Sequence, residues 1–295
     1  MAWERHELGG RPLFVWAPAD RSRVYPTVYV LHAHMRDAQS WFNVAPFEQS
    51  YPDAIAELDP PAVVALVDGW TELGGGQWIG PVGAYLRDEV VPFVDSRYPT
   101  DGRRGLQGKS SGGYGALVHA LERPDLFQAV AAHAPDALFD VTLAHGFPTA
   151  ARALRDRSLE EFWAGFSGLR SSEDALLIEL SACAAAFGDG MLPFDLETGA
   201  VDPARFAAWL EHDPVRLAPR RREAVGSLRG VWLDAGRRDE YFLDLGAVAL
   251  RGALLAAGLP EERLRFELHD GGHRGLGERY PLSLAWLVDR LGGGA

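Results

Sequence analysis

A serine stands between two glycines in the run Gly108-Lys109-Ser110-Ser111-Gly112. A serine hydroxyl becomes a good nucleophile only when a neighbouring base takes its proton. The G-x-S-x-G pattern is typical of a sharp turn between a strand and a helix that exposes such a serine. Its glycines permit the turn because they have no Cβ atom. The pattern therefore predicts Ser110 as a nucleophile for acyl chemistry.

The same run also resembles the end of a phosphate-binding loop, G-x-x-x-x-G-K-[ST]. The first glycine of that loop would have to occupy position 103, and the nearest glycine, Gly102, comes one residue too early. Arg103 and Arg104 would also crowd backbone amides that must surround a phosphate. Acyl chemistry is the preferred interpretation, and a turn serine without chemistry is the remaining alternative.

His273 is the predicted general base for Ser110. It lies in the glycine-rich segment 270–275, directly after the last predicted strand. Loops at the carboxyl ends of parallel strands are where such sheets hold catalytic groups. His269 lies on the strand itself and is the less favoured alternative. The remaining histidines after Ser110 that we assign to surface or packing roles are His119, His145 and His212.

The carboxylate that orients the histidine is expected between Ser110 and His273, because the order serine, acid, histidine is typical of this kind of site. Three acidic residues follow a predicted strand there: Asp234, Asp239 and Glu240. Asp234 is too close to the strand, and Glu240 is expected to begin or cap the next helix. Asp239 is therefore the predicted acid, with helix capping as its alternative role.

Acyl transfer also needs hydrogen-bond donors for the negative charge that develops on the carbonyl oxygen. One predicted donor is the backbone N–H of Ser111, and the other is that of His34 on the loop after an early strand, with Met35 as the alternative. Lys109, the only lysine of the chain, adjoins the nucleophile. The predicted substrate pocket consists of Lys109, Met35, Trp41, Trp70 and Trp78.

Alternating strands and helices are predicted to position these residues. Apolar runs indicate strands at 11–16, 27–31, 62–67, 105–107, 130–133, 230–233 and 264–268. Helical periodicity indicates helices at 47–58, 81–98, 113–121, 241–257 and 281–291. This alternation predicts an α/β fold with a mostly parallel sheet and helices on both faces.

The alternation stops between residues 136 and 224. Helical patterns such as 159–166 and 204–209 are separated there by Gly, Pro and Asp loops, and no run is typical of a strand. We therefore expect a single domain over residues 1–295 that carries a helical cap insertion at 136–224.

Composition limits the partners of the chain. With 295 residues, 47% hydrophobic and 24% charged, it is typical of a globular protein. A formal net charge of -12 argues against a nucleic-acid partner. Cys183 is the only cysteine, which excludes an internal disulfide and a thiolate zinc site. A charged start and the lack of a long apolar run predict a cytoplasmic protein without a membrane span.

These motifs resemble the putative esterase family of α/β-hydrolases, which includes esterase D, feruloyl esterases, enterochelin esterases and mycolyltransferases. The resemblance covers the catalytic domain but not the insertion, and runs through residues 29–32, 89–92, 108–117, 236–240 and 271–273. It implies an α/β-hydrolase fold and ester cleavage without a cofactor or metal. The chain departs from the family at Ala33, where glycine is frequent, and at Ser111, where methionine is frequent.

The predicted function is cleavage of a small-molecule carboxylic ester by a Ser-His-Asp triad through an acyl-enzyme. Acyl transfer or thioester cleavage by the same triad is an alternative, because these reactions differ only in the acceptor or the leaving group. A non-catalytic binding protein with a hydrolase fold is a second alternative, which the complete set of triad residues disfavours.

Overall fold

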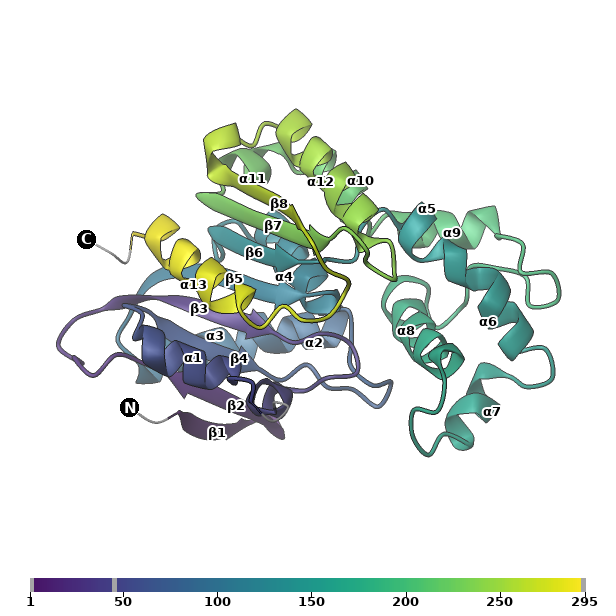
Figure 1. Ribbon diagram of the computed structural model, residues 1–295, viewed down its shortest axis with the longest axis horizontal. Helices are drawn as coiled ribbons and strands as arrows, with labels where there is room; N and C mark the ends of the chain where they lie inside the picture. The colour runs from purple at the N-terminus through teal and green to yellow at the C-terminus, as the bar shows by residue number, and fades with distance from the viewer. Residues whose placement is uncertain (1–2, 44–46, 293–295) are drawn as a thin grey trace.

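The computed structural model describes residues 3–43 and 47–292. One eight-stranded sheet crosses the molecule in the order β1-β2-β4-β3-β5-β6-β7-β8 (Figure 1). The two N-terminal strands are antiparallel, whereas β3 to β8 run parallel. The strands are β1 (Glu4–Leu8), β2 (Arg11–Trp16), β3 (Tyr25–Leu31), β4 (Val63–Val67), β5 (Thr100–Lys109), β6 (Ala129–His133), β7 (Gly230–Gly236) and β8 (Leu264–His269).

Two strands differ most from the sequence prediction, and β7 also continues to Gly236, three residues beyond the predicted segment 230–233. β5 starts five residues before the predicted segment 105–107, because its polar first half pairs with β3 although it is only half-buried. β1 was not predicted, since as an edge strand it has mostly exposed side chains and no apolar run. The prediction identified strands by the apolar runs that buried strands need. Both of these segments lack such a run and are held mainly by backbone hydrogen bonds, so the prediction missed them.

Helices cover both faces of the sheet (Figure 1). The larger core contains side chains from α2 (Gly80–Ala84), α3 (Val91–Arg97), α4 (Ser111–Glu122) and α12 (Leu243–Ala257). The smaller core, on the other face, contains side chains from η1 (Ala38–Phe42), α1 (Tyr51–Leu58) and α13 (Arg279–Arg290). None of the described helices combines the length and the apolar run that crossing a bilayer would require.

Two predicted helices have different boundaries. The helix predicted at 81–98 is observed as one continuous helical segment over residues 80–97, in which a π-helical stretch, η2 (Tyr85–Val90), separates α2 from α3. Pro92 lies just after it; proline cannot donate a helical hydrogen bond and crowds the carbonyl four residues earlier, which the wider turn accommodates. The helix predicted from residue 47 begins instead at Tyr51, because the Ser50 side chain caps it by accepting from the Asp53 N–H.

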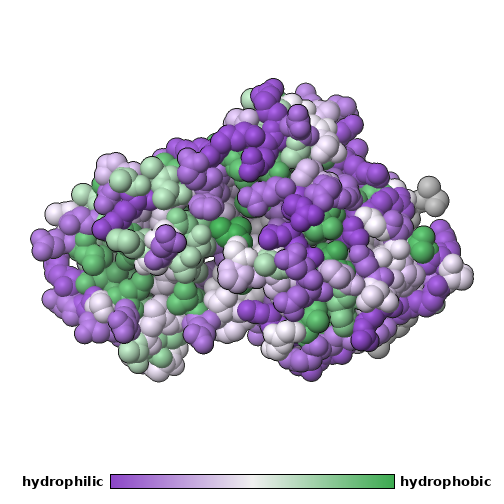
Figure 2. Space-filling model, turned by 180° about the vertical axis from the view of Figure 1, so that it is seen from behind, coloured by the Kyte–Doolittle hydropathy of each residue, from purple (hydrophilic) through white to green (hydrophobic). Residues whose placement is uncertain are grey.

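The chain between β6 and β7 is helical. It contains α5 (Phe139–Thr142), η3 (Ala144–Gly146), α6 (Phe147–Ala153), α7 (Leu159–Ala164), α8 (Ser172–Phe187), α9 (Pro203–Leu210), α10 (Pro214–Arg220) and α11 (Arg222–Ser227). Figure 1 shows α6 to α9 as a group at the end of the molecule beyond β6 and β7. Aromatic packing stabilises this group. The rings of Phe147 and Phe194, for example, are stacked with 4.8 Å between their centroids. Seen from behind in Figure 2, the same lobe displays hydrophobic residues among its polar surface.

Candidate active site

Ser110 lies in the turn between β5 and α4 with φ 55° and ψ -124°. A positive φ is strained for a residue that has a Cβ atom, and such strain persists only where the surroundings enforce it. The flanking glycines are required by close contacts. A Cβ atom on Gly108 would lie 2.2 Å from the Gly112 carbonyl oxygen, and one on Gly112 would lie 2.2 Å from that of Leu31. The turn therefore has the geometry that the G-x-S-x-G pattern predicts.

His273 and Asp239 form a hydrogen-bonded pair. The Nδ1 atom of His273 lies 2.9 Å from Oδ2 of Asp239, and both side chains are buried. The other oxygen of Asp239 accepts from the Tyr241 backbone N–H at 2.9 Å. The Tyr241 ring contacts the imidazole edge to face, with 4.9 Å between ring centroids. These contacts fix the plane of the imidazole and leave its Nε2 atom for chemistry.

The loops after β7 and β8 are tied to each other. Glu240 accepts a hydrogen bond from the backbone N–H of His273 at 2.7 Å. The Arg238 N–H donates to the Gly271 carbonyl at 2.9 Å. The prediction that Glu240 begins or caps the next helix is wrong, because α12 starts at Leu243 and the carboxylate turns to the histidine loop instead. Glu240 is therefore a positioning residue for His273.

Burial and hydrogen bonding shift the pKa values of this pair. Burial lowers the pKa of His273 below its ordinary value, against the opposing effect of the Asp239 hydrogen bond. Burial alone would raise the pKa of Asp239, but the His273 hydrogen bond and charge reverse this effect and lower it. The imidazole is therefore neutral and the carboxylate ionised near pH 7, which are the protonation states that a general base and its orienting acid require.

Ser110 and His273 line one cavity of about 310 Å³, here called the serine cavity. Three other predicted residues, His34, Met35 and Lys109, line it as well. Lining residues that the sequence reasoning did not identify are Ala33, Arg36, Asp136, Leu169, Ala175, Glu179, Tyr241, Leu243 and Arg274. Leu169, Ala175 and Glu179 come from the helical segment between β6 and β7, so that segment contributes one wall.

Two carboxyl groups of this wall have unusual protonation. Asp136 lies on the loop after β6, and the Ser110 hydroxyl donates to its Oδ1 atom at 3.4 Å. Burial raises the pKa of Asp136 to about 7 and that of Glu179 to about 8. Asp136 follows a strand end just as Asp239 and His273 do. The same strand-end rule could therefore have identified it, whereas Glu179, on α8, has no such signal.

The predicted oxyanion donors lie on opposite sides of Ser110 in the sequence. Ser111 is the first residue of α4, and the first amides of a helix have no partner within it. On the loop after β3, the Met35 N–H already donates to the Gly74 carbonyl at 2.7 Å. Met35 is thus engaged elsewhere, which leaves His34 as the candidate on that loop.

The three predicted tryptophans lie apart from the serine cavity. Trp41 lines an adjoining cavity with Lys109. Trp78 is 1% exposed and is a core residue. Its side chain occupies space left by Gly115, where an added Cβ atom would lie 2.3 Å from the Cβ atom of Trp78, and its indole N–H donates to the His32 carbonyl. For Trp78 the pocket prediction is wrong.

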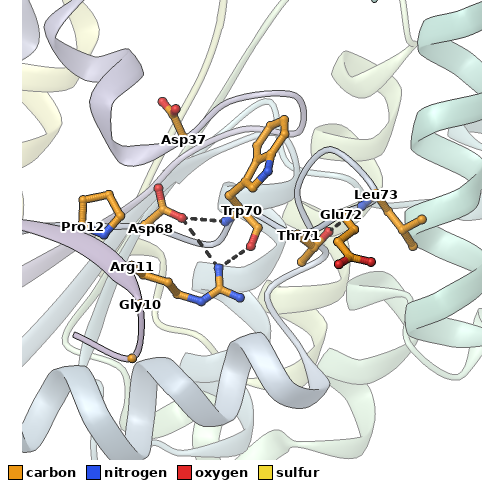
Figure 3. Close-up of a pocket in the computed structure, with 10 residues that line it drawn as sticks. Gly10, Arg11, Pro12, Asp37, Asp68, Trp70, Thr71, Glu72 and Leu73 are labelled. Carbon is orange, nitrogen blue, oxygen red and sulfur yellow. Dashed lines mark hydrogen bonds and ion pairs between the residues drawn. The ribbon is translucent and has the colours of Figure 1, made fainter. Parts of the chain in front are cut away.

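Trp70 lines a third and larger hollow of about 750 Å³ (Figure 3). Asp68 accepts from the Trp70 N–H there and pairs with Arg11 at 3.7 Å. The structure thus places Trp70 in a hollow that, over the described residues, has neither serine nor histidine in its lining, and not in the serine cavity. Among the described residues, no group of three or more His, Cys, Asp or Glu side chains is arranged to hold a metal ion.

Asp234, the rejected alternative acid, has a structural role. It is buried, and its oxygens lie 2.8 Å from Nδ1 of His133 and 2.7 Å from Nε of Arg279. The Trp232 indole N–H donates to it as well. Asp234 therefore balances the charge of Arg279 and holds the side chains of His133 and Trp232 in place.

Comparisons with known proteins show the family and the fold of the chain. A family model described as "Putative esterase" matches residues 10–286. A ferulic acid esterase is 16% identical, with 99% of this chain and 98% of that chain covered and a TM-score of 0.62. The S-formylglutathione hydrolase of Agrobacterium tumefaciens is 18% identical, with coverage of 98% and 94% and a TM-score of 0.57. The fluorophosphonate-binding serine hydrolase F of Staphylococcus aureus is 16% identical, with 97% of each chain covered and a TM-score of 0.61. The shared fold confirms the predicted fold class.

Proposed function

The chain belongs to this esterase family, and from that premise we propose that it is a serine hydrolase that cleaves a carboxylic ester through Ser110, His273 and Asp239. The observation that carries the proposal is the buried pair of His273 and Asp239, 2.9 Å apart, at the cavity that also contains the strained Ser110. All three residues follow the carboxyl ends of parallel strands, and these ends lie on the same side of the sheet.

The proposed reaction begins when Ser110 Oγ attacks the ester carbonyl carbon and its proton passes to His273 Nε2. The backbone N–H groups of Ser111 and His34 stabilise the oxyanion that forms. Collapse of this intermediate breaks the ester bond, and the imidazolium donates its proton to the leaving alcohol. Water then attacks the acyl-enzyme, with His273 again as the base, and releases the acid.

Two further features of this chain bear on the reaction. The Ser110 hydroxyl, which donates to Asp136 in the free protein, turns to His273 before attack. The helices at 136–224 act as a cap, because α8 contributes Glu179 to the wall of the serine cavity. The cap would thus determine which acyl groups enter.

A fluorophosphonate probe tests the nucleophile, because it reacts with serines that a base activates. We expect one label per chain, located on Ser110 by peptide mass spectrometry. Ser110→Ala and His273→Ala should both lose labelling and turnover of an aryl acetate. Ser96→Ala, which removes an exposed hydroxyl elsewhere, should keep both. Labelling that persists in Ser110→Ala would exclude the assignment.

A further inference from the structure

Three cationic side chains border the serine cavity: Arg36, Lys109 and Arg274. They come from the loop after β3, the end of β5 and the loop after β8. All three also line a second cavity of about 230 Å³, here called the cation cavity. The two cavities therefore adjoin along these side chains, and the cation cavity lies beside Ser110.

The cation cavity has no countercharge of its own. Within residues 3–43 and 47–292, its lining contains no aspartate or glutamate, since Asp136 and Glu179 line only the serine cavity. Among the described residues, no carboxylate lies within 4.0 Å of any of the three cations. Burial lowers the pKa of Lys109 to about 8, and the charges of both arginines add to this effect, although the carboxylates of Asp239 and Asp136 oppose it. Like charges that are gathered without a partner repel one another, and a bound anion would remove that cost.

Much of the remaining lining of the cation cavity is apolar, although His32 and Ser40 also contribute to it. Trp41, Leu276 and Tyr280 line it, and the rings of Trp41 and Tyr280 meet edge to face with centroids 5.1 Å apart. These aromatic side chains pack in the smaller core beneath the cavity. A flat apolar surface beside three cations is complementary to a ring or short chain that carries an oxyanion.

We propose that the cation cavity is a substrate subsite for an oxyanion, so that the preferred esters carry a carboxylate or phosphate group. Arg36 and Arg274 each present a planar set of N–H donors that can bind two oxygens of such a group, while Lys109 adds a compact charge next to Ser110. The inference rests on the proposed function, because the subsite is useful only if Ser110 is acylated. In a chain of net charge -12, it concentrates positive charge where the ester must bind.

Matched aryl esters test the inference with the full chain. The alcohol arm compares 3-carboxyphenyl acetate and 3-acetoxyphenyl phosphate with neutral 3-carbamoylphenyl acetate. The acyl arm compares phenyl hydrogen succinate with neutral phenyl succinamate. We expect kcat/KM to favour the anionic ester in one arm by roughly tenfold or more, since a hydrogen bond to a charged group is typically worth that much. The arm that responds identifies the part of the ester in the cation cavity, and the carboxylate-to-phosphate ratio identifies the preferred oxyanion.

Charge-removing variants assign the effect to these residues. Arg36→Gln and Arg274→Gln should each lower the ratio of anionic to neutral kcat/KM by roughly tenfold. They should also weaken competitive inhibition by benzoate, measured with the neutral acetate as substrate. Arg155→Gln, which removes an exposed cap arginine that lines neither cavity, should leave the ratio and the inhibition unchanged.

The outcomes separate the two proposals. Equal turnover of anionic and neutral esters in both arms would overturn the oxyanion subsite, while Ser110 labelling and neutral turnover would still support a serine hydrolase. A preference that survives in Arg36→Gln and Arg274→Gln would also overturn it. If the unaltered chain did not react with the fluorophosphonate probe, both proposals would be overturned.

Discussion

The hydroxyl of Ser110 lies 3.4 Å from Oδ1 of Asp136 and donates its hydrogen bond there. The Asp136 carboxyl loses its proton within the pH range in which enzymes commonly work, because burial raises its pKa to about 7. Charged groups that face this carboxyl include Lys109, Asp239 and Glu179. The availability of the nucleophile should therefore depend on pH.

We expect kcat/KM to rise with pH as His273 loses its proton, below the ordinary histidine pKa, and to fall as pH passes about 7. The fall is expected because an ionised Asp136 holds the Ser110 proton more strongly than a neutral carboxyl does. In Asp136→Asn the fall near pH 7 should disappear. Asp125→Asn removes an exposed carboxylate and is the control. A pH profile that is unaltered in Asp136→Asn would contradict this role.

Asp136 should also make the fold less stable at high pH. Its carboxyl titrates at an ordinary value of 3.8 in the unfolded chain and at about 7 in the folded one. The folded chain thus binds this proton more tightly, and the free energy of unfolding falls as pH rises between these values. Asp136→Asn stays neutral, so urea titrations should show it gaining roughly 2 to 4 kcal/mol relative to the unaltered chain between pH 4 and pH 8. If the difference in unfolding free energy between the variant and the unaltered chain stayed constant over this pH range, the raised pKa of Asp136 would be contradicted.

The positive φ of Ser110 predicts that any side chain at this position lowers the stability of the fold. Glycine adopts a φ of 55° without a Cβ clash, whereas alanine does not. Ser110→Gly should therefore be more stable than Ser110→Ala by about 1 kcal/mol, although both lack esterase activity. Urea unfolding of the two variants measures the difference. Equal midpoints would indicate that the turn is unstrained.

Glu240 should act on the rate through His273. Glu240→Ala removes the acceptor for the His273 N–H, and we expect kcat to fall roughly tenfold with little change in KM. Glu240→Gln keeps an acceptor oxygen and should recover most of the rate. Asp270→Ala, at an exposed position on the loop after β8 that carries His273, is the control. An equal loss in the alanine and glutamine variants would show that charge, rather than the hydrogen bond, matters.

Gly112 should tolerate no side chain. A Cβ atom there would lie 2.2 Å from the Leu31 carbonyl oxygen and 2.6 Å from that of His32, so α4 would have to move away from β3. Gly112→Ala should lose about 3 kcal/mol of unfolding free energy or more. Gly252→Ala, on α12 with no atom within 4 Å of the new methyl group, should instead gain about 0.5 to 1 kcal/mol. Calorimetry of both variants distinguishes these effects.

Sequence patterns could locate Ser110 and His273 because local rules constrain both. The turn around Ser110 needs glycine where backbones approach closely, and His273 directly follows a strand that its apolar residues predict. The fold class followed from the same strand pattern, since buried parallel strands need continuous apolar residues.

The remaining groups depend on contacts that no local pattern records. Trp78 fills the space left by Gly69 and Gly115, which are not its neighbours in the sequence, so its burial is a tertiary property. Glu179 reaches the serine cavity from α8, and only the path of the chain between β6 and β7 brings it there. Asp136 was missed because the expected order of acid and histidine directed attention to the strand after it.

The tied loops after β7 and β8 have an evolutionary consequence. A Cβ atom on Gly236 would lie 2.5 Å from the carbonyl oxygens of both Gly271 and Gly272, so neither loop can change its backbone alone. We expect substitutions and length changes in these two loops to be inherited together across relatives of this chain. The loop of Ser110 is held by β3 and α4 instead, so changes in it should not be correlated with changes in these two loops.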